Sequence, residues 1–382
     1  MIKLRIKNGE HETDISFPIT EEGLREKLSE INCGESRFAS QSVFVSAVHH
    51  PKELSVLNER YADLDELNYL AKRMESFDSL EYDQFIIGIS KLKAPTEKDL
   101  INLTFNLDHF TLCRDVSSFG RIGRAYVLNT EGCVPIGDEA DPKYAAIGKD
   151  LVYRGLTQMT ERGLLVYDPS VELTEVYDGH TFPEYCYKNC NVSVAVRKAE
   201  RSELIQLPEE ELAIEKALAR LGAASEDECE ITLELNGMDT FSERFMRVIQ
   251  DEGLYAANEL IRQIDKEDLD WAKLAAVTEF TGAHRAEDIA LIAKRLDDFV
   301  FAPFAMNEED VGSYFVNNFS EYDLSPDMEV FFDYQGFGES IVERFDGRFV
   351  DGGFVCYTGE GGLDELLEQI DSEDEDMGME EL

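Results

Sequence analysis

The chain has 382 residues, and 36 Lys plus Arg against 80 Asp plus Glu give it a formal net charge of −44 at pH 7. Hydrophobic residues make up 43% of the chain and aromatic residues 10%, which excludes a disordered acidic chain of low hydrophobicity. The sequence has neither the roughly 20 consecutive apolar residues of a membrane span nor the apolar run of a signal peptide. We therefore expect a folded cytoplasmic protein of two domains, since this length exceeds a single core.

The first half opens with an alternating strand at residues 2–7 and a second strand before Pro18. A helix is expected next, at residues 21–31, and then another alternating strand at residues 42–48. A helical stretch follows at about residues 52–128, and it contains the segments LDELNYLAKRM and KDLINLTFNLDHF. The half closes with a short helix and a strand, which together form a small α/β ending.

The second half repeats this order at a shift of 189 or 190 residues. Four residues of the first half recur in the second: Asn68 as Asn258, Gly123 as Gly312, Gly148 as Gly338, and Gly163 as Gly353. A constant shift across the whole chain predicts whole-domain duplication, because solenoid repeats are only roughly 20 to 50 residues long. We expect an α+β fold of two tandem copies, each a ββαβ unit with a helical segment and a small α/β unit, arranged as an elongated pseudo-dimer. The copies are 1–190 and 191–370, and 371–382 form a disordered acidic tail.

The negative charge is concentrated in the second copy. Residues 1–190 hold 32 acidic and 21 basic side chains and residues 191–382 hold 48 and 15, so the two parts carry −11 and −33. Such charge opposes compaction by self-repulsion, so a binding function is expected to favour it. The candidate partner-binding residues are the acidic pairs and triplets of the second copy: Glu226, Asp227, Glu228, Glu267, Asp268, Asp270, Glu287, Asp288, Asp297, Asp298, Glu308, Glu309 and Asp310.

Helical carboxylates would be fixed on a rigid support. We expect one helix through residues 260–275, with Leu260, Ile264 and Trp271 facing inward and the acids between them facing out. Carboxylates three or four positions apart are separated axially by roughly 5 to 6 Å, which is similar to the phosphate spacing along one nucleic-acid strand. An array of this kind fits a basic groove that normally binds DNA. Two other interpretations stay open, namely ordinary solvated faces and the generally acidic surfaces of a halophilic proteome.

No motif predicts catalysis. The sequence contains no GxSxG, GxxxxGK[ST], HExxH or strand-linked GxGxxG pattern. Gly120 and Gly123 lie near arginines, but helix packing explains them better than phosphate binding. Cys186 and Cys190 near His180 lack the second ligand pair that zinc sites have, and the cysteines are expected to be reduced. We therefore expect no catalytic, cofactor or metal site.

The segments LDELNYLAKRM, KDLINLTFNLDHF, GRAYVLN and YAAIGKDLVYRGLTQMTERGLLVY, in this order, resemble ArdA-type antirestriction proteins of mobile elements. The second copy carries fainter equivalents in AANELIRQI, EDIALIAKRLDDF, VGSYFV and FGESIVERFDGRFVDGGFVCY. The resemblance implies an elongated acidic protein that imitates bent B-DNA and occupies the DNA groove of type I restriction and modification enzymes, as a competitive inhibitor and not an enzyme. This chain differs in carrying the unit twice, which implies a covalent pair in place of a homodimer.

The expected partner is thus the basic DNA-binding groove of a host defence protein, with no direct nucleic-acid binding and no membrane partner. A Cas effector is an alternative target, because its channels for guide, target and PAM are also basic. A different class of function, an acidic scaffold or histone-like chaperone for basic proteins, also fits the charge. The sequence leaves open whether the pair dimerises again.

Overall fold

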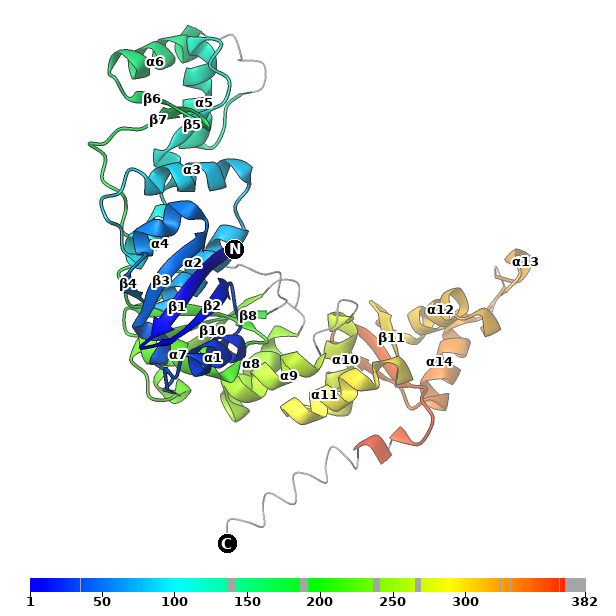
Figure 1. Ribbon diagram of the computed structural model, residues 1–382. Coiled ribbons are helices and arrows are strands. Elements are labelled where there is room, and N and C mark those ends of the chain that lie inside the picture. Colours follow the sequence, from blue (N-terminus) through cyan, green and yellow to red (C-terminus); the bar gives the residue numbers. More distant parts are fainter. Residues whose placement is uncertain are drawn as a thin grey trace. The chain divides into compact units, whose positions relative to one another are not determined.

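The computed structural model describes residues 1–34, 36–135, 142–185, 192–235, 241–264, 269–322, 324–329, 331–363 and 365–367 (Figure 1). The fold is α+β, with small antiparallel sheets and helices packed against them, as expected. Two compact units are formed. The first contains Met1–Asn189, Arg197–Leu204 and Glu210–Ala224, and the second contains Cys190–Val196, Ile205–Glu209 and Ser225–Leu382.

The first half begins with a four-stranded sheet in the order β2-β1-β3-β4 and ends with a three-stranded sheet in the order β5-β7-β6. Its strands and helices, in chain order, are β1 (Ile2–Asn8), β2 (His11–Phe17), α1 (Glu21–Glu30), β3 (Val43–His50), β4 (Arg60–Ala62), α2 (Leu64–Glu75), α3 (Ser79–Ile89), α4 (Glu97–Thr104), β5 (Thr111–Cys113), α5 (Phe119–Glu131), α6 (Pro142–Tyr153), β6 (Thr157–Thr160) and β7 (Gly163–Val166). Short 3-10 turns lie at Ala39–Gln41, Lys52–Leu57 and Leu107–His109.

The second half has two three-stranded sheets, in the orders β10-β8-β9 and β11-β13-β12. Its elements are β8 (Val192–Lys198), β9 (Arg201–Leu207), α7 (Glu211–Leu221), β10 (Glu230–Leu235), α8 (Ser242–Glu252), α9 (Leu254–Ile264), α10 (Trp271–Thr281), α11 (Ala286–Lys294), β11 (Phe299–Pro303), α12 (Glu308–Asn318), α13 (Pro326–Glu329), α14 (Tyr334–Arg344), β12 (Arg348–Val350) and β13 (Gly353–Tyr357). The 3-10 turns Glu226–Glu228, Leu296–Asp298 and Ser320–Tyr322 lie between them.

Both halves place corresponding strands in the same sheet order. In the first sheet the opening strand lies between its hairpin partner and the strand that follows the first helix, as β2-β1-β3 and as β9-β8-β10. In the second sheet the last strand lies centrally, as β5-β7-β6 and as β11-β13-β12. The second half adds α8 where the first half has a 3-10 turn and β4. Duplication of one unit is the interpretation that we propose for this parallel.

Alternation along the first strands creates the core of the opening sheet. Ile2, Leu4 and Ile6 on β1 are fully buried, while the residues between them face away from the core. β1 pairs antiparallel with β2 so that Ile2 lies opposite Phe17. Helix α1 is capped by Thr20, whose side chain accepts a hydrogen bond from the Gly23 N–H. This satisfies one of the N–H groups that have no partner within the helix at its N-terminus.

Asn68 and Asn258 make the same contacts in the two halves. The Asn68 side chain on α2 accepts from the Ile19 N–H and donates to the Ile19 carbonyl, both at 2.9 Å. Asn258 on α9 makes the same two bonds with Glu209, both at 2.8 Å. Both amides are buried. Each therefore ties a helix to the backbone that leads into the first helix of its half.

The two small α/β layers depend on glycines at helix contacts. A Cβ at Gly123 would lie 1.9 Å from the Tyr144 carbonyl oxygen, and one at Gly148 would lie 2.0 Å from the Phe119 oxygen. In the second half a Cβ at Gly312 would lie 2.1 Å from the Tyr334 oxygen. Helices α5 and α6, and equally α12 and α14, therefore touch backbone to backbone. Helix packing is thus the role of Gly123, as the sequence predicted, but the same prediction was wrong for Gly120, where an added Cβ would meet only the Ser118 hydroxyl at 3.7 Å.

These layers have small cores of matched residues. Cys113 on β5 lies opposite Leu164 on β7, and Ala302 on β11 lies opposite Phe354 on β13. The buried residues that correspond in position are Cys113, Ile122, Leu151, Leu164 and Val166 in the first half and Ala302, Val311, Ile341, Phe354 and Cys356 in the second. The same backbone frame therefore accepts different core side chains.

Some sequence predictions of secondary structure were wrong. The expected helix through 260–275 is two helices, because α9 ends at Ile264 and α10 begins at Trp271 with Asp270 as its N-cap. The expected helical stretch 52–128 also contains the short strand β4. The helix within KDLINLTFNLDHF ends at Thr104, and strand β5 follows it. The predicted disordered tail, 371–382, lies outside the described residues. Among the helices that the structure describes, none has the length and apolar character needed to cross a membrane.

The glycine contacts give a matched test. Gly123→Ala should lower the free energy of unfolding by about 1 to 3 kcal/mol, because the added methyl group meets backbone that has to shift. Gly120→Ala, one turn earlier in α5, should leave it unchanged or slightly raised, because its Cβ meets only the Ser118 hydroxyl at 3.7 Å. Urea unfolding of both variants measures the difference. Equal stabilities would contradict the close helix contact.

Candidate partner-binding surface

Several of the predicted acidic residues hold helix ends. The Glu226 carboxylate accepts from the Leu254 N–H at 2.9 Å at the start of α9. Asp270 accepts from the Lys273 N–H at 2.9 Å at the start of α10. Asp310, in the first turn of α12, accepts from the Met306 N–H at 3.0 Å. Carboxylates at these positions also compensate the positive end of the helix dipole, so part of the acidic excess serves the fold.

Two other predicted residues are also tied into the fold. Asp288 on α11 is buried, with 3% of its surface exposed, so it does not contribute to a surface. Asp298 is half-buried and pairs with Arg295 at 2.9 Å. Neither aspartate therefore belongs to a freely accessible carboxylate array.

The remaining predicted residues within the described part of the chain lie on or near the surface. Asp227 and Glu228 are exposed beside strand β10, Glu287 is exposed on α11, and Asp297 is exposed before β11. In the first turn of α12, Glu309 is exposed and Glu308 is half-exposed. Glu267 and Asp268 lie outside the described residues. The accessible acids thus come from several elements of the second compact unit and not from one continuous helix.

An acidic cleft includes two of these residues in its lining. Its volume is about 490 Å³, and Glu226, Asp227, Asp251 and Glu252 are among its lining residues. Glu252 accepts from the Ala286 N–H at 2.7 Å, which fixes the start of α11. The two aspartates are exposed. The cleft therefore combines carboxylates that hold backbone with carboxylates that face solvent.

The outer faces of the two matched helix pairs carry opposite charge. Two residues before the contacting glycine, α5 has Arg121 where α12 has Asp310. One residue after the other glycine, α6 has Lys149 where α14 has Glu339, and both side chains are exposed. The first turn of α12 is Glu308, Glu309, Asp310, whereas that of α5 is Phe119, Gly120, Arg121. One backbone frame therefore presents a basic face in the first half and an acidic face in the second.

Several acids of the first half are buried or paired. Burial, reinforced by the nearby Asp65 carboxylate, raises the pKa of Asp63 to about 6. Burial also raises the pKa of Glu66 to about 7, although the Tyr177 hydroxyl donates to its carboxylate at 2.8 Å. Asp83 is paired with both Arg114 and Arg162. The first half accordingly has fewer free carboxylates near pH 7 than its sequence suggests.

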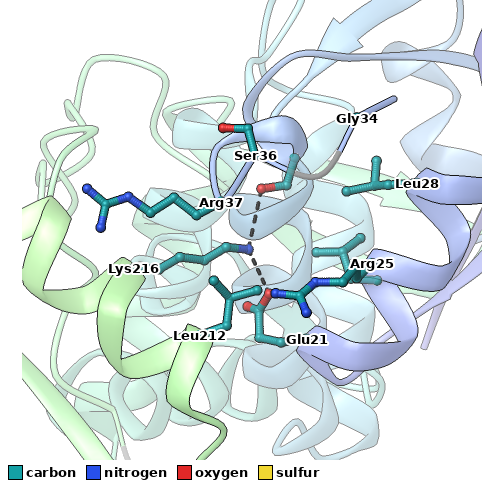
Figure 2. Close-up of a pocket in the computed structure, with 10 residues that line it drawn as sticks. Glu21, Arg25, Leu28, Gly34, Ser36, Arg37, Leu212 and Lys216 are labelled. Atoms are coloured by element: carbon teal, nitrogen blue, oxygen red, sulfur yellow. Dashed lines mark hydrogen bonds and ion pairs between the residues drawn. The ribbon is translucent and has the colours of Figure 1, made fainter. Parts of the chain in front are cut away.

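A small cavity in the first compact unit is filled by an ion network (Figure 2). Lys216 of α7 is 5% exposed and its Nζ lies 2.7 Å from Glu21 and 2.8 Å from Asp65. Figure 2 shows the Lys216 side chain pointing toward Glu21. The Lys216 Nζ also donates to the Ser40 hydroxyl at 3.4 Å. The free volume is about 20 Å³, which accommodates about one water molecule. The network is therefore a structural contact and not a ligand pocket.

Two of these features escaped the sequence analysis. Lys216 looks like an ordinary exposed helix lysine in ELAIEKALARL, and only packing reveals its acidic partners. The reversed charges at Arg121 and Asp310 were visible once Gly123 and Gly312 had been aligned, but only the helix contact shows that both belong to one outer face. The cysteines Cys33, Cys113, Cys133 and Cys356 are free thiols. Cys186 and Cys190 lie outside the described residues.

No protein-family model matches the chain, and the comparison with curated proteins found no match either. The resemblance to ArdA-type proteins therefore stays a prediction from the sequence.

The ion network gives a second prediction. Lys216→Met should lower the free energy of unfolding by about 3 to 5 kcal/mol, because it leaves Glu21 and Asp65 buried without their cation. Lys27→Met removes only an exposed pair with Glu30 and should cost less than about 1 kcal/mol. Chemical denaturation compares the two variants. A Lys216 variant as mild as the Lys27 variant would show that the network contributes little.

The buried Glu66 gives a pH-dependent prediction. Its folded pKa is about 7 and its unfolded pKa is about 4.3, so the folded state binds the extra proton between these values. Stability is therefore gained as pH falls through 7 and is lost as pH rises. Glu66→Gln, which keeps an acceptor for Tyr177, should be more stable than the wild type by about 1 kcal/mol at pH 8, after allowance for solvent screening, and equal to it at pH 4. Urea unfolding at both pH values measures this, and a pH-independent difference would contradict it.

Proposed function

We propose that this chain is an acidic DNA mimic that inhibits a host defence enzyme by occupying its DNA-binding groove, with a type I restriction and modification complex as the favoured target. The observation that carries this proposal is the charge reversal on two matched helix pairs. Arg121 and Lys149 of the first half are replaced by Asp310 and Glu339 in the second, while the glycine contacts beneath them stay the same. Asp310 also accepts from the Met306 N–H, but the first half builds the same helix contact with an arginine at this position, so the contact itself does not require an acid and a partner accounts for the acidic version better.

The physical basis is competition for positive charge. Enzymes that bind DNA do so mainly through Lys and Arg that face the phosphates. Exposed carboxylates held on short, capped helices offer the same groups a preorganised anionic surface. Glu287 and Glu309 are exposed in the first turns of α11 and α12, and Asp297 is exposed in the 3-10 turn before β11. Such a surface repels nucleic acid, so the proposed partner is the enzyme and not DNA.

Other parts of the proposal follow from this mode of action. The chain binds and does not catalyse, it acts in the cytoplasm of a bacterial host, and the tandem halves stand in for the homodimer of ArdA-type proteins. The two halves are then unequal, with the second providing most of the imitation. Support for that inequality comes from the charges of −11 and −33 and from the buried or paired acids of the first half.

A pair of triple variants tests the proposal. Glu287→Gln, Asp297→Asn and Glu309→Gln together remove three exposed charges from the second half, and Glu10→Gln, Glu131→Gln and Glu161→Gln remove three exposed charges from the first. The first set should raise the concentration needed to inhibit DNA cleavage by a purified type I complex at least about tenfold, and the second set by less than about twofold. The affinity of the first set should also depend less steeply on salt.

Three outcomes count against the proposal or redirect it. Equal losses in both sets would contradict the assignment of the imitation to the second half. Inhibition of a purified Cas effector instead of the restriction complex would move the target to that class. Binding of histones or other basic proteins with no protection of DNA from cleavage would favour an acidic scaffold.

A further inference from the structure

Two large apolar side chains stand in solvent between β11 and α12. Phe304 is 84% exposed and Met306 is 70% exposed. They alternate with Ala305, which is buried in the core of the α12 and α14 layer. The short segment is thus anchored through its middle residue, while its two bulky side chains remain outside the core.

The backbone of this segment is fixed by hydrogen bonds. The Phe304 N–H donates to the Gly352 carbonyl at 2.8 Å, and the Met306 N–H donates to the Asp310 carboxylate at 3.0 Å. Asn307 then caps α12 by accepting from the Asp310 N–H at 3.0 Å. Both apolar side chains therefore project from a held backbone, which lowers the entropy that binding through them would cost.

Phe304 occupies a backbone conformation that favours glycine. Its φ is +64°, in the left-handed region that L side chains adopt only with strain. A glycine here would relieve the strain and would also remove an exposed ring. The aromatic residue is thus costly to the fold twice over, through backbone strain and through apolar exposure.

The first half shows that the fold does not need these side chains. At the corresponding positions before α5 it has Asp115 and Ser117, whose side chains are smaller and polar. There the Asp115 carboxylate accepts from the Ser117 N–H at 3.0 Å, and Ser118 caps the helix as Asn307 does. The first-half segment is therefore held by polar contacts, with Val116 between them 43% exposed, whereas the second-half segment exposes the larger side chains of Phe304 and Met306.

We propose that Phe304 and Met306 form an apolar anchor that inserts into a recess of a protein partner, and that basic residues at the rim of this recess bind Glu308, Glu309 and Asp310. The three carboxylates follow the anchor directly on α12, so charge complementarity defines the rim as Lys- and Arg-rich. A buried aromatic anchor with a charged surround is the usual energetic centre of a protein interface. The inference rests on the proposed function and names the contact by which the same inhibitor holds its enzyme.

The anchor has a consequence for how binding responds to salt. Carboxylates that replace phosphates lose affinity as salt rises, because the electrostatic contact is screened. Burial of an aromatic and a thioether side chain does not involve charge and persists at high salt. The anchor therefore supplies the salt-independent part of the affinity and the carboxylates supply the salt-dependent part.

The test uses the full chain and a purified type I restriction and modification complex as the probe. Phe304→Ser with Met306→Ser should weaken binding at least about tenfold at every salt concentration, with the slope of affinity against salt unchanged. Tyr153→Ser with Met159→Ser is the matched control in the first half, since these side chains are 83% and 64% exposed, and it should bind within about twofold of the wild type. Glu308→Gln with Glu309→Gln should reduce the slope.

Phe304→Gly separates binding from folding. It should weaken binding as the serine pair does, yet leave the melting temperature unchanged or raise it, because glycine adopts the left-handed backbone without strain. A loss of both would mean that the ring supports the fold, and would overturn the inference. Wild-type binding that is insensitive to the serine pair would overturn the anchor and leave the proposed function standing. If the wild type does not bind the complex at all, the proposed function fails and the anchor fails with it.

Discussion

The contact between two helix backbones at paired glycines is the constraint on which both small α/β layers depend. Gly123 lies against the backbone of α6 and Gly312 lies against that of α14, at distances that no side chain allows. This contact fixes which faces of the two helices point outward and leaves their outer residues free to vary. The same frame can then carry Arg121 and Lys149 in one half and Asp310 and Glu339 in the other. Because the glycine contact constrains only the inner faces of the helices, the same fold can carry basic outer residues in one half and acidic outer residues in the other.

The acidic excess has more than one physical role. Some carboxylates complete helix N-termini, as Glu226 does for α9 and Asp270 does for α10, and these would be favoured in any protein of this fold. Others are withdrawn from the surface by burial or by pairing, as Asp288 and Asp298 are. Only the exposed remainder has no structural explanation. Functional interpretation of so large a net charge therefore depends on this remainder and not on the total.

A segment of the second half stabilises acids of the first half. Lys216, which belongs to α7 in sequence but to the first compact unit in space, neutralises Glu21 and Asp65. Nearby, Glu210 accepts from the N–H groups of Glu21 and Glu22 at the start of α1. The first compact unit thus includes Glu210–Ala224, a segment that lies beyond the domain boundary expected at residue 190. A buried, fully paired network of this kind is sensitive to the loss of any one member.

The sequence alone determined the α+β class, the opening order of strand, strand, helix and strand in each half, and the inequality of charge between the halves, because strand alternation, helical period and composition are local properties. It also indicated that Gly123 serves helix packing, since a glycine inside an apolar helical pattern usually marks a close approach. The sequence could not divide residues 260–275 into two helices. An aspartate that caps the start of a helix, as Asp270 does, fits the same sequence pattern as an aspartate on the exposed face of one continuous helix. Nor could the sequence separate exposed carboxylates from buried or capping ones, or find the partners of Lys216, because those depend on which distant segments pack together. The exposure of Phe304 could not be predicted for the same reason. An apolar residue suggests a core position, and only the tertiary structure shows that Ala305 is buried beside it and that the Phe304 N–H bonds to Gly352 while its ring is exposed.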